Sequence, residues 1–330
     1  MDKLIVTGSC GFIGYNFIES NINNFEIVGI DSLNDAYDKN LKLLRLKNLE
    51  KYSNFSFKQI NLSDEGALTK EEEIFKNVKV VLHLAARAGV RQSFLDPKSY
   101  ISDNTIATAV LSRYVKKYEI DKFIITSTSS IYGDTGTELA KENESELKNP
   151  PSIYAATKSF GEVLSNNILE NTSTIIQIPR FFTVYGPFGR PDMSILRFIH
   201  WIANNQEVII YGDGEQKRSF TYIEDIVNGL NKLIDINKKG TFNFGSNQTW
   251  SLNEVIKMIE DNLGMKANKS HRERAMKDVD IVLPSLEISK SILGWEPKIN
   301  IEDGLKRTVQ WYKEYEKELR DINFKYEYEK

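Results

Sequence analysis

The sequence predicts an α/β protein built on a doubly wound parallel sheet. In the first half of the chain, short apolar segments rich in β-branched residues alternate with longer segments of helical period. The apolar segments are nearly continuous, which is typical of parallel strands covered by helices on both faces. After about Pro179 this alternation loosens into shorter elements, so we expect a smaller C-terminal α/β substrate lobe with a cleft against the first lobe.

The individual elements follow from the same patterns. The expected strands are KLIVT (3–7), FEIVGID (25–31), KVVLHLA (79–85), KFIITST (122–128) and STIIQIP (173–179). The expected helices are Phe12 to Asn21, Asn40 to Glu50, Tyr100 to Tyr118 and Tyr154 to Glu170. From Ile301 onward, the charged and aromatic-dotted stretch suggests a solvated terminal helix. We therefore expect a first domain over 1–180, with segments near 220–245 returning to it, and a second domain mainly over 181–330.

Composition argues against several classes of protein. The chain has 330 residues and a formal net charge of −3, with acidic and basic residues mixed, so nucleic-acid binding is not expected. Its single cysteine, Cys10, excludes an internal disulfide framework, and His83, His200 and His271 lie too far apart to suggest a metal site. No apolar stretch approaches the ~20 residues of a membrane span, and the N-terminus lacks a signal-peptide core. We expect a cytoplasmic globular protein with no membrane partner.

A glycine-rich loop, TGSCGFIG (7–14), links the first strand to the first helix. In this context Gly8 permits a tight turn, Gly11 lets the backbone approach a pyrophosphate, and Gly14 lets the helix pack close to the strand. The helix N-terminus then offers free N–H groups and a partial positive charge to phosphates. The alternative is a plain strand–helix turn. The loop predicts a dinucleotide site in a Rossmann-type domain.

Asp31 ends the second expected strand, seventeen residues after Gly14. This is close to the spacing of ~20 residues at which an acid binds the adenosine ribose. A carboxylate accepts hydrogen bonds from ribose hydroxyls and repels a 2′-phosphate, and the next residue is Ser32 rather than arginine. The sequence therefore favours NAD over NADP, unless Asp31 merely caps a turn.

Four motifs in chain order resemble the extended short-chain dehydrogenase/reductase family. They are the G-x-x-G-x-x-G spacing of the loop, HLAARAGVR (83–91), STSSIYG (127–133) and YAATK (154–158). The resemblance runs from about Asp2 to Pro297. It implies an enzyme that acts on a nucleotide sugar with NAD as cofactor. It also implies further cofactor contacts from Phe12, Ile13, Asn61, Leu62, Leu84, Ala85 and Ala86.

The chemistry of such a site follows from its residue types. Oxidising a sugar carbon requires removal of the hydroxyl proton, and tyrosine is a poor base at its ordinary pKa of about 10. Lys158, one helical turn after Tyr154, shares its face, so the ammonium can stabilise the phenolate. Thr128, at the end of an expected strand, would hydrogen-bond the same hydroxyl. Asn104 is expected to be a structural polar group.

The residues after Thr128 bear on the reaction. Relatives that dehydrate the sugar carry an Asp-Glu pair there, and UDP-glucuronate decarboxylases carry a glutamate at the second position. Ser129 and Ser130 cannot act as carboxyl bases, which leaves epimerisation at carbon 4. The segments 31–46, 88–93 and 180–193 narrow the resemblance to UDP-glucuronate 4-epimerases. The alternatives are a UDP-glucose or UDP-N-acetylhexosamine 4-epimerase, a 4,6-dehydratase, or a catalytically silent NAD-binding regulator.

The resemblance also implies a UDP-sugar site. Arg218, in KRSFTYIEDI, would bind the UDP pyrophosphate. The sugar carboxylate would meet Arg190, with hydroxyl donors from Ser129, Ser130 and Thr183, although Arg190 could instead pair with Asp192. The remaining expected substrate contacts are Arg87 and Met193. Relatives carry a Pro-Gly-Asp segment near 272–280 that this chain lacks, which leaves contacts of Arg272 or Arg274 with UDP undecided. By analogy, we expect a homodimer formed through helices 100–118 and 154–170.

Overall fold

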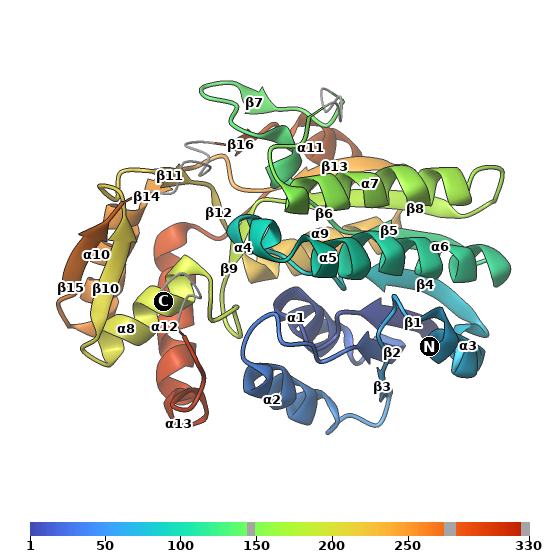
Figure 1. Ribbon diagram of the computed structural model, residues 1–330, viewed down its shortest axis with the longest axis horizontal. Coiled ribbons are helices and arrows are strands. Elements are labelled where there is room, and N and C mark those ends of the chain that lie inside the picture. The colour runs from blue at the N-terminus through green and yellow to red at the C-terminus, as the bar shows by residue number, and fades with distance from the viewer. Residues whose placement is uncertain (144–148, 274–281, 325–330) are drawn as a thin grey trace.

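Figure 1 shows the computed structural model, which describes residues 1–143, 149–273 and 282–324. Its centre is one large sheet in which every pairing is parallel. In spatial order the strands are β13 (Gly240–Phe244), β8 (Ile175–Phe181), β5 (Lys122–Ile125), β4 (Val78–His83), β1 (Asp2–Thr7), β2 (Phe25–Asp31) and β3 (Phe55–Gln59), with β6 (Ser127–Thr128) also paired to β8. The predicted doubly wound parallel sheet is confirmed.

The sheet is buried on both faces because neighbouring residues of a strand enter opposite cores. In β1, Leu4 and Val6 belong to one hydrophobic cluster and Ile5 to the other. The first cluster also takes in α1 (Phe12–Asn21), α2 (Lys39–Leu49) and α9 (Ile223–Asp235), and the second takes in α3 (Glu65–Lys70) and α6 (Ala107–Lys117). This alternation explains why the strands show continuous apolar segments in the sequence.

The chain reverses its direction across the sheet between β1 and β4. Strands β1, β2 and β3 proceed toward one edge, and β4, β5 and β8 then proceed toward the other. In open α/β sheets, a crevice opens at the carboxyl ends of the strands where the order reverses. The loops after β1 and β4 meet there, since Leu84 N donates to Thr7 O over 3.2 Å.

The helix expected over 100–118 has a different winding. It is preceded by α4 (Val90–Leu95) and begins as α5 (Pro97–Tyr100). It continues as a π-helical segment, η2 (Ile101–Ile106), and becomes α-helical only in α6. Within η2, Asn104 donates to Arg87 O over 3.0 Å and accepts from Arg87 N over 2.7 Å. These tertiary bonds of a buried amide accompany the wider turns, which apolar periodicity does not reveal.

The second lobe, at the left of Figure 1, is built around α8 (Ser194–Ala203) and α10 (Leu252–Leu263). In the described parts of the chain, four short strand pairs lie outside the large sheet: β10 (Glu207–Tyr211) with β15 (Asn268–Arg272), β9 (Thr183–Tyr185) with β12 (Phe220–Tyr222), β11 (Lys217–Arg218) with β14 (Trp250–Ser251), and β7 (Leu139–Ala140) with β16 (Leu283–Pro284). The remaining short helices are η1 (Glu72–Phe75), η3 (Ser129–Tyr132), α11 (Glu287–Leu293) and α13 (Glu316–Leu319).

The expectation of a solvated terminal helix is wrong for α12 (Ile301–Glu314). Ile301, Leu305 and Val309 form an apolar stripe at helical spacing, and all three are buried. Trp311 and Tyr312 are buried as well, and the helix packs against α8 and α10. The charged residues of α12 cover only its outer face, which is why composition alone suggested full exposure.

Candidate active site

A cavity of about 400 Å³ lies where the loops after β1, β4 and β6 meet the N-terminal part of α7 (Ile153–Ile168). Most residues predicted for the site line it. These are Gly8, Gly11, Phe12, Ile13, Gly14, Asp31, Asn61, Leu62, Leu84, Ala85, Ala86, Thr128, Ser129, Ser130, Tyr154, Lys158, Thr183, Arg190 and Met193. Residues more than 180 positions apart therefore share one cavity.

The glycine-rich loop is packed too tightly for larger residues. Gly8 has a φ of +68°, and a Cβ there would lie 2.7 Å from the amide nitrogen of Ala85. A Cβ on Gly14 would lie 2.2 Å from the carbonyl oxygen of Gly8. The N-terminus of α1 consequently opens directly onto the cavity, where its free N–H groups can meet an anion. This cradle fits the pyrophosphate of a dinucleotide.

Asp31, at the carboxyl end of β2, is buried and held in a fixed orientation. Its Oδ2 accepts from Cys10 N over 3.1 Å and its Oδ1 accepts from Leu33 N over 2.8 Å. Each carboxylate oxygen retains a further lone pair for a ligand hydroxyl. The carboxylate thus helps to orient the loop and also lines the cavity.

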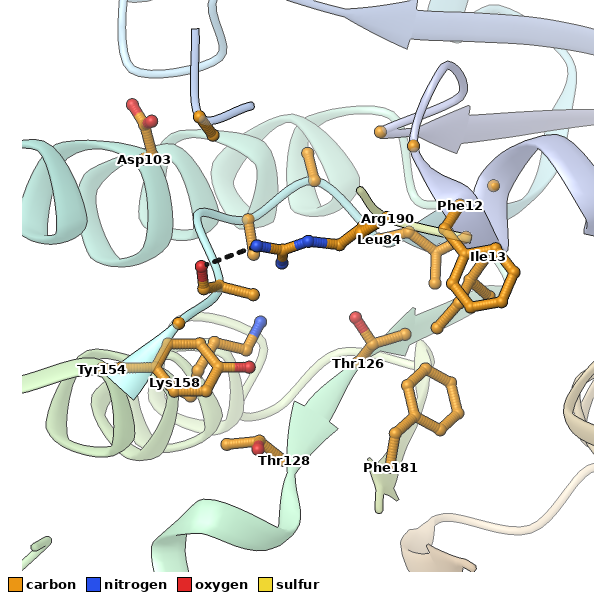
Figure 2. Close-up of a pocket in the computed structure, with 18 of the residues that line it drawn as sticks. Phe12, Ile13, Leu84, Asp103, Thr126, Thr128, Tyr154, Lys158, Phe181 and Arg190 are labelled. Atoms are coloured by element: carbon orange, nitrogen blue, oxygen red, sulfur yellow. Dashed lines mark hydrogen bonds between the residues drawn. The ribbon is translucent and has the colours of Figure 1, made fainter. Parts of the chain in front are cut away.

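Tyr154 and Lys158 project from α7 into the cavity beside Thr128 (Figure 2). The side chain of Ser152 caps this helix by accepting from Ala155 N over 3.1 Å. Burial raises the pKa of Tyr154, whereas a hydrogen bond with Thr128 and the positive charge of Arg190 act to lower it. Burial lowers the pKa of Lys158 to about 8, against the opposing effect of Glu162. The site therefore holds two groups: a phenol that can exchange a proton with a ligand, and a lysine whose pKa is lowered toward neutral pH.

A buried ion pair holds these elements together. Arg180 of β8 donates through Nη2 to Glu162 Oε2 of α7 over 2.7 Å and through Nε to Oε1 over 3.1 Å. Ser127 of β6 also donates to Glu162 Oε1. Arg180 Nη1 reaches Tyr132 OH over 2.9 Å. The residue before Thr128 is therefore tied to the helix that carries Tyr154.

Arg190 lines the cavity and is also braced by its neighbours. Its Nε and Nη2 donate to the two oxygens of Asp192 over 3.0 and 2.5 Å, and Nη2 donates to Ala88 O over 3.2 Å, the dashed line in Figure 2. Nη1 has no hydrogen-bond partner among the residues that the structure describes. The alternative pairing of Arg190 with Asp192 is present, and it leaves one amino group of Arg190 for a ligand.

Three predicted or undecided arginines, Arg87, Arg218 and Arg272, do not line this cavity. Arg87 donates to Asp103 over 3.0 Å and to Asp35 over 3.4 Å. Arg218 lies on β11 and donates to Lys217 O over 2.8 Å. Arg272 lies 3.7 Å from Glu207, and Arg274 falls outside the described residues.

Sequence reasoning missed a polar group that follows β2. Asn34, Tyr37 and Lys42 all line the cavity, and Lys42 Nζ donates to Asn34 O over 2.9 Å and to Asn34 Oδ1 over 2.5 Å. Asp103 of η2, which also lines the cavity, accepts from Asn34 Nδ2 over 3.2 Å. The segment 31–46 carries a family resemblance as a whole, but nothing in its spacing shows which side chains turn inward.

Comparisons with known proteins agree with this architecture. Residues 5–308 match the profile of the family described as GDP-mannose 4,6 dehydratase. The chain is 40% identical over 316 residues to a UDP-glucuronate 4-epimerase of Thermodesulfobacterium geofontis, covering 95% of this chain and 97% of that protein. A crystal structure of UDP-glucuronic acid 4-epimerase from Bacillus cereus, in complex with UDP-glucuronic acid and NAD, superposes with a TM-score of 0.86 at 32% identity, covering 94% and 99% of the two chains. The UDP-glucose 4-epimerase of Thermotoga maritima gives a TM-score of 0.85 at 28% identity, covering 94% and 99%.

Proposed function

This chain belongs to the extended short-chain dehydrogenase/reductase family, within the group described as GDP-mannose 4,6 dehydratase, and we propose from that premise that it is an NAD-dependent UDP-glucuronate 4-epimerase. The observation that carries the proposal is the cavity wall formed by Thr128, Ser129 and Ser130 beside Tyr154. This wall offers hydroxyl groups and no carboxyl base. Arg190, in the same cavity, supplies a cationic donor suited to a sugar carboxylate.

The residues fit NAD and a reversible oxidation at sugar carbon 4. The glycine cradle and Asp31 would hold the pyrophosphate and the adenosine ribose, and NAD, when bound, supplies a reversible hydride acceptor. Tyr154 takes the hydroxyl proton from carbon 4 as the hydride leaves that carbon, and Lys158 stabilises the resulting phenolate. Thr128 positions the hydroxyl. After the 4-keto sugar has rotated in the site, hydride would return to the opposite face of carbon 4 while Tyr154 returns the proton to the carbonyl oxygen.

The carboxylate must be held while the sugar turns. A 4-keto uronate is a β-keto acid, which loses CO₂ when its carboxylate bond stands perpendicular to the carbonyl plane. Ser129, Ser130 and Thr183 can donate hydroxyl hydrogen bonds from two sides of the cavity, and Nη1 of Arg190 is available as a further donor. We assign these groups to holding the carboxylate near that plane, with Met193 contacting the sugar.

We further propose that the two lobes bind different ligands. Residues 1–180 would bind NAD and residues 181–330 mainly the nucleotide sugar, with 220–245 contributing to the first domain. In support, β13 pairs with β8 and α9 packs against α1. Arg87 and Arg218 remain proposed contacts of the nucleotide sugar outside the cavity described above.

A cytoplasmic location also remains a proposal. Its support is that the chain's single cysteine, Cys10, is a buried free thiol, as suits a reducing compartment. Among the residues that the structure describes, none of the helices has the length and apolar character that a membrane crossing requires. Fractionation of the source cells, followed by immunoblotting, tests the location, and recovery outside the cytoplasm would contradict it.

The substrate is tested with a panel of UDP-sugars and NMR of the products. We expect interconversion of UDP-glucuronate and UDP-galacturonate with little pentose product, and much weaker action on UDP-glucose. Arg190→Ala or Thr183→Val should raise KM for the uronate about tenfold or more, because each charge-assisted contact contributes ~1.5–3 kcal/mol. NAD affinity should change little. Preferred turnover of UDP-glucose or a UDP-N-acetylhexosamine by the wild type would favour the alternative, which the likeness to a UDP-glucose 4-epimerase supports.

The role of Tyr154 is tested by Tyr154→Phe, which keeps the ring and removes the proton acceptor. Turnover of UDP-glucuronate should fall by about 10²- to 10⁴-fold, the usual contribution of general acid–base catalysis. NAD binding and the unfolding temperature should stay close to wild type. Tyr118→Phe is a matched control, because Tyr118 stacks on Phe75 away from the cavity. Near-normal turnover by Tyr154→Phe would exclude the mechanism.

The role of Asp31 is tested by titrating cofactor-free protein with NAD and NADP. Its buried carboxylate would repel a 2′-phosphate, so we expect NAD to bind at least ten times more tightly, a difference that needs only ~1.4 kcal/mol. Asp31→Asn should reduce the preference for NAD over NADP, because it removes the negative charge of the side chain while keeping its shape. Equal affinities for the two cofactors in the wild type would contradict the assignment.

A homodimer is the proposed assembly. Apolar side chains lie exposed on the outer surfaces of η2 and α7, among them Ile101, Ile106 and Phe160, which are 48%, 46% and 52% exposed. Sedimentation equilibrium should give a dimer for the wild type and a monomer for Phe160→Asp, because burying the new charge in an apolar interface is unfavourable. A monomeric wild type would rule this assembly out.

A further inference from the structure

Arg45 of α2 has a fully buried side chain that joins three separate segments. Its Nη1 donates to Cys10 O over 2.9 Å and to Tyr37 OH over 2.7 Å. Its Nη2 donates to Phe188 O over 2.7 Å and to Gly189 O over 3.0 Å. These acceptors belong to the glycine-rich loop, the connection between β2 and α2, and the turn that precedes Arg190. One guanidinium thus links both loops that the proposed function requires.

The charge of Arg45 has no carboxylate partner within 4.0 Å among residues 1–143, 149–273 and 282–324. The guanidinium instead faces backbone carbonyl groups of two loops and the hydroxyl of one tyrosine. Its Nε makes no hydrogen bond to any residue that the structure describes. Burying a cation in such surroundings is unfavourable unless its donors are well used. A planar fork that reaches four acceptors is something a lysine or an amide cannot reproduce. This arrangement indicates that the site requires a side chain whose donors can reach all four acceptors at once.

On the cofactor side, Arg45 acts on a peptide of the glycine-rich loop. The carbonyl of Cys10 accepts from Arg45, and the N–H of the same residue donates to Asp31 Oδ2 over 3.1 Å. Cys10 consequently lies between a buried cation and a buried anion. Its backbone orientation is fixed in the loop that we assign to the pyrophosphate, next to the acid assigned to the ribose.

On the sugar side, Arg45 holds a strained turn. Phe188 has a φ of +56°, a left-handed conformation that is unfavourable for a residue with a side chain. Its ring is fixed between Tyr15 and Trp311, with ring centroids 4.4 and 4.8 Å away. The carbonyl of Gly189, which Arg45 binds, belongs to the same peptide unit as the amide nitrogen of Arg190. Arg45 therefore fixes the backbone from which Arg190 extends.

Tyr37 provides a second connection between the two arginines. Its hydroxyl accepts from Arg45, and the guanidinium of Arg190 lies over its ring, 5.5 Å from the centroid. Arg190 is thus supported by Asp192 on one side and by a ring that Arg45 holds on another. A shift of Arg45 would move the backbone and the aromatic support of Arg190 together.

We propose that Arg45 is a positioning residue that couples the NAD-binding loop to Arg190 and thereby sets the preference for an acidic sugar. The inference rests on the proposed function, since it concerns how Arg190 is aligned for the uronate carboxylate. Arg45 does not line the cavity, so we assign it no direct contact with substrate or cofactor. It keeps the glycine-rich loop and the turn before Arg190 in one relative position, so that disturbance of either loop is felt at the other.

The first experiment measures Arg45→Lys against wild type. Lysine keeps the charge but cannot span from Cys10 to Gly189. KM for UDP-glucuronate should rise about tenfold, as expected for loss of a charge-assisted hydrogen bond acting through Arg190, and NAD should bind several-fold more weakly. The inhibition constant of UDP-glucose, which lacks the carboxylate, should change less than about twofold. Arg113→Lys, an exposed arginine paired with Glu65, is the matched control and should change none of these values.

The second experiment places Arg45→Lys in the Arg190→Ala background. If Arg45 acts through Arg190, the double variant should have the same KM for UDP-glucuronate as Arg190→Ala, while NAD binding is still weakened. A further tenfold rise in KM would overturn the coupling. The coupling would also be overturned if Arg45→Lys raised KM for UDP-glucuronate and the inhibition constant of UDP-glucose by the same factor. That result would indicate a general structural role for Arg45.

Tyr37→Phe repeats this cycle should Arg45→Lys fail to fold. It removes one acceptor of Arg45 and keeps the ring beside Arg190, so we expect the same pattern with a smaller change. Unchanged KM values in the folded variants would refute the coupling while leaving the proposed function intact. A wild type that does not convert UDP-glucuronate would refute the proposed function, and the NAD titrations would still test the link between Arg45 and the glycine-rich loop.

Discussion

The buried ion pair between Glu162 and Arg180 determines how the elements around the candidate site fit together. Arg180 lies on β8, Glu162 on α7, and Ser127 of β6 donates to the same carboxylate. Breaking one partner of such a pair leaves an uncompensated buried charge, which typically costs about 3–5 kcal/mol. The pair therefore holds the helix of Tyr154 and Lys158 against the strand of Thr128. It also anchors β8, from which the chain proceeds to Thr183 and Arg190.

The parts of the site that local chemistry dictates could be predicted from the sequence. The glycines were recognisable because only Gly fits where a Cβ would lie 2.2 Å from a carbonyl oxygen, as at Gly14. Tyr154 and Lys158 share a helix face through their spacing alone. The parallel sheet followed from continuous apolar segments, which needs no knowledge of long-range contacts.

What could not be predicted depends on contacts between distant segments. Nothing local shows that Arg45 of α2 binds Phe188 and Gly189, which lie more than 140 positions away. The π-helical turns of η2 accompany tertiary bonds of Asn104, and the burial of α12 depends on the surface offered by α8 and α10. An amphipathic helix and a solvated one can share the same composition.

The pairing of Arg190 with Asp192 bears on how a uronate could be both held and allowed to turn. An unpaired buried guanidinium would bind a carboxylate strongly and would resist the rotation that epimerisation requires. Asp192 neutralises much of that charge and fixes the plane of the guanidinium through two hydrogen bonds. The remaining Nη1 and the short hydroxyls of Ser129, Ser130 and Thr183 then offer several contacts of moderate strength. Because these donors lie on different elements, a carboxylate can exchange one for another as the ring turns without losing all of them at once.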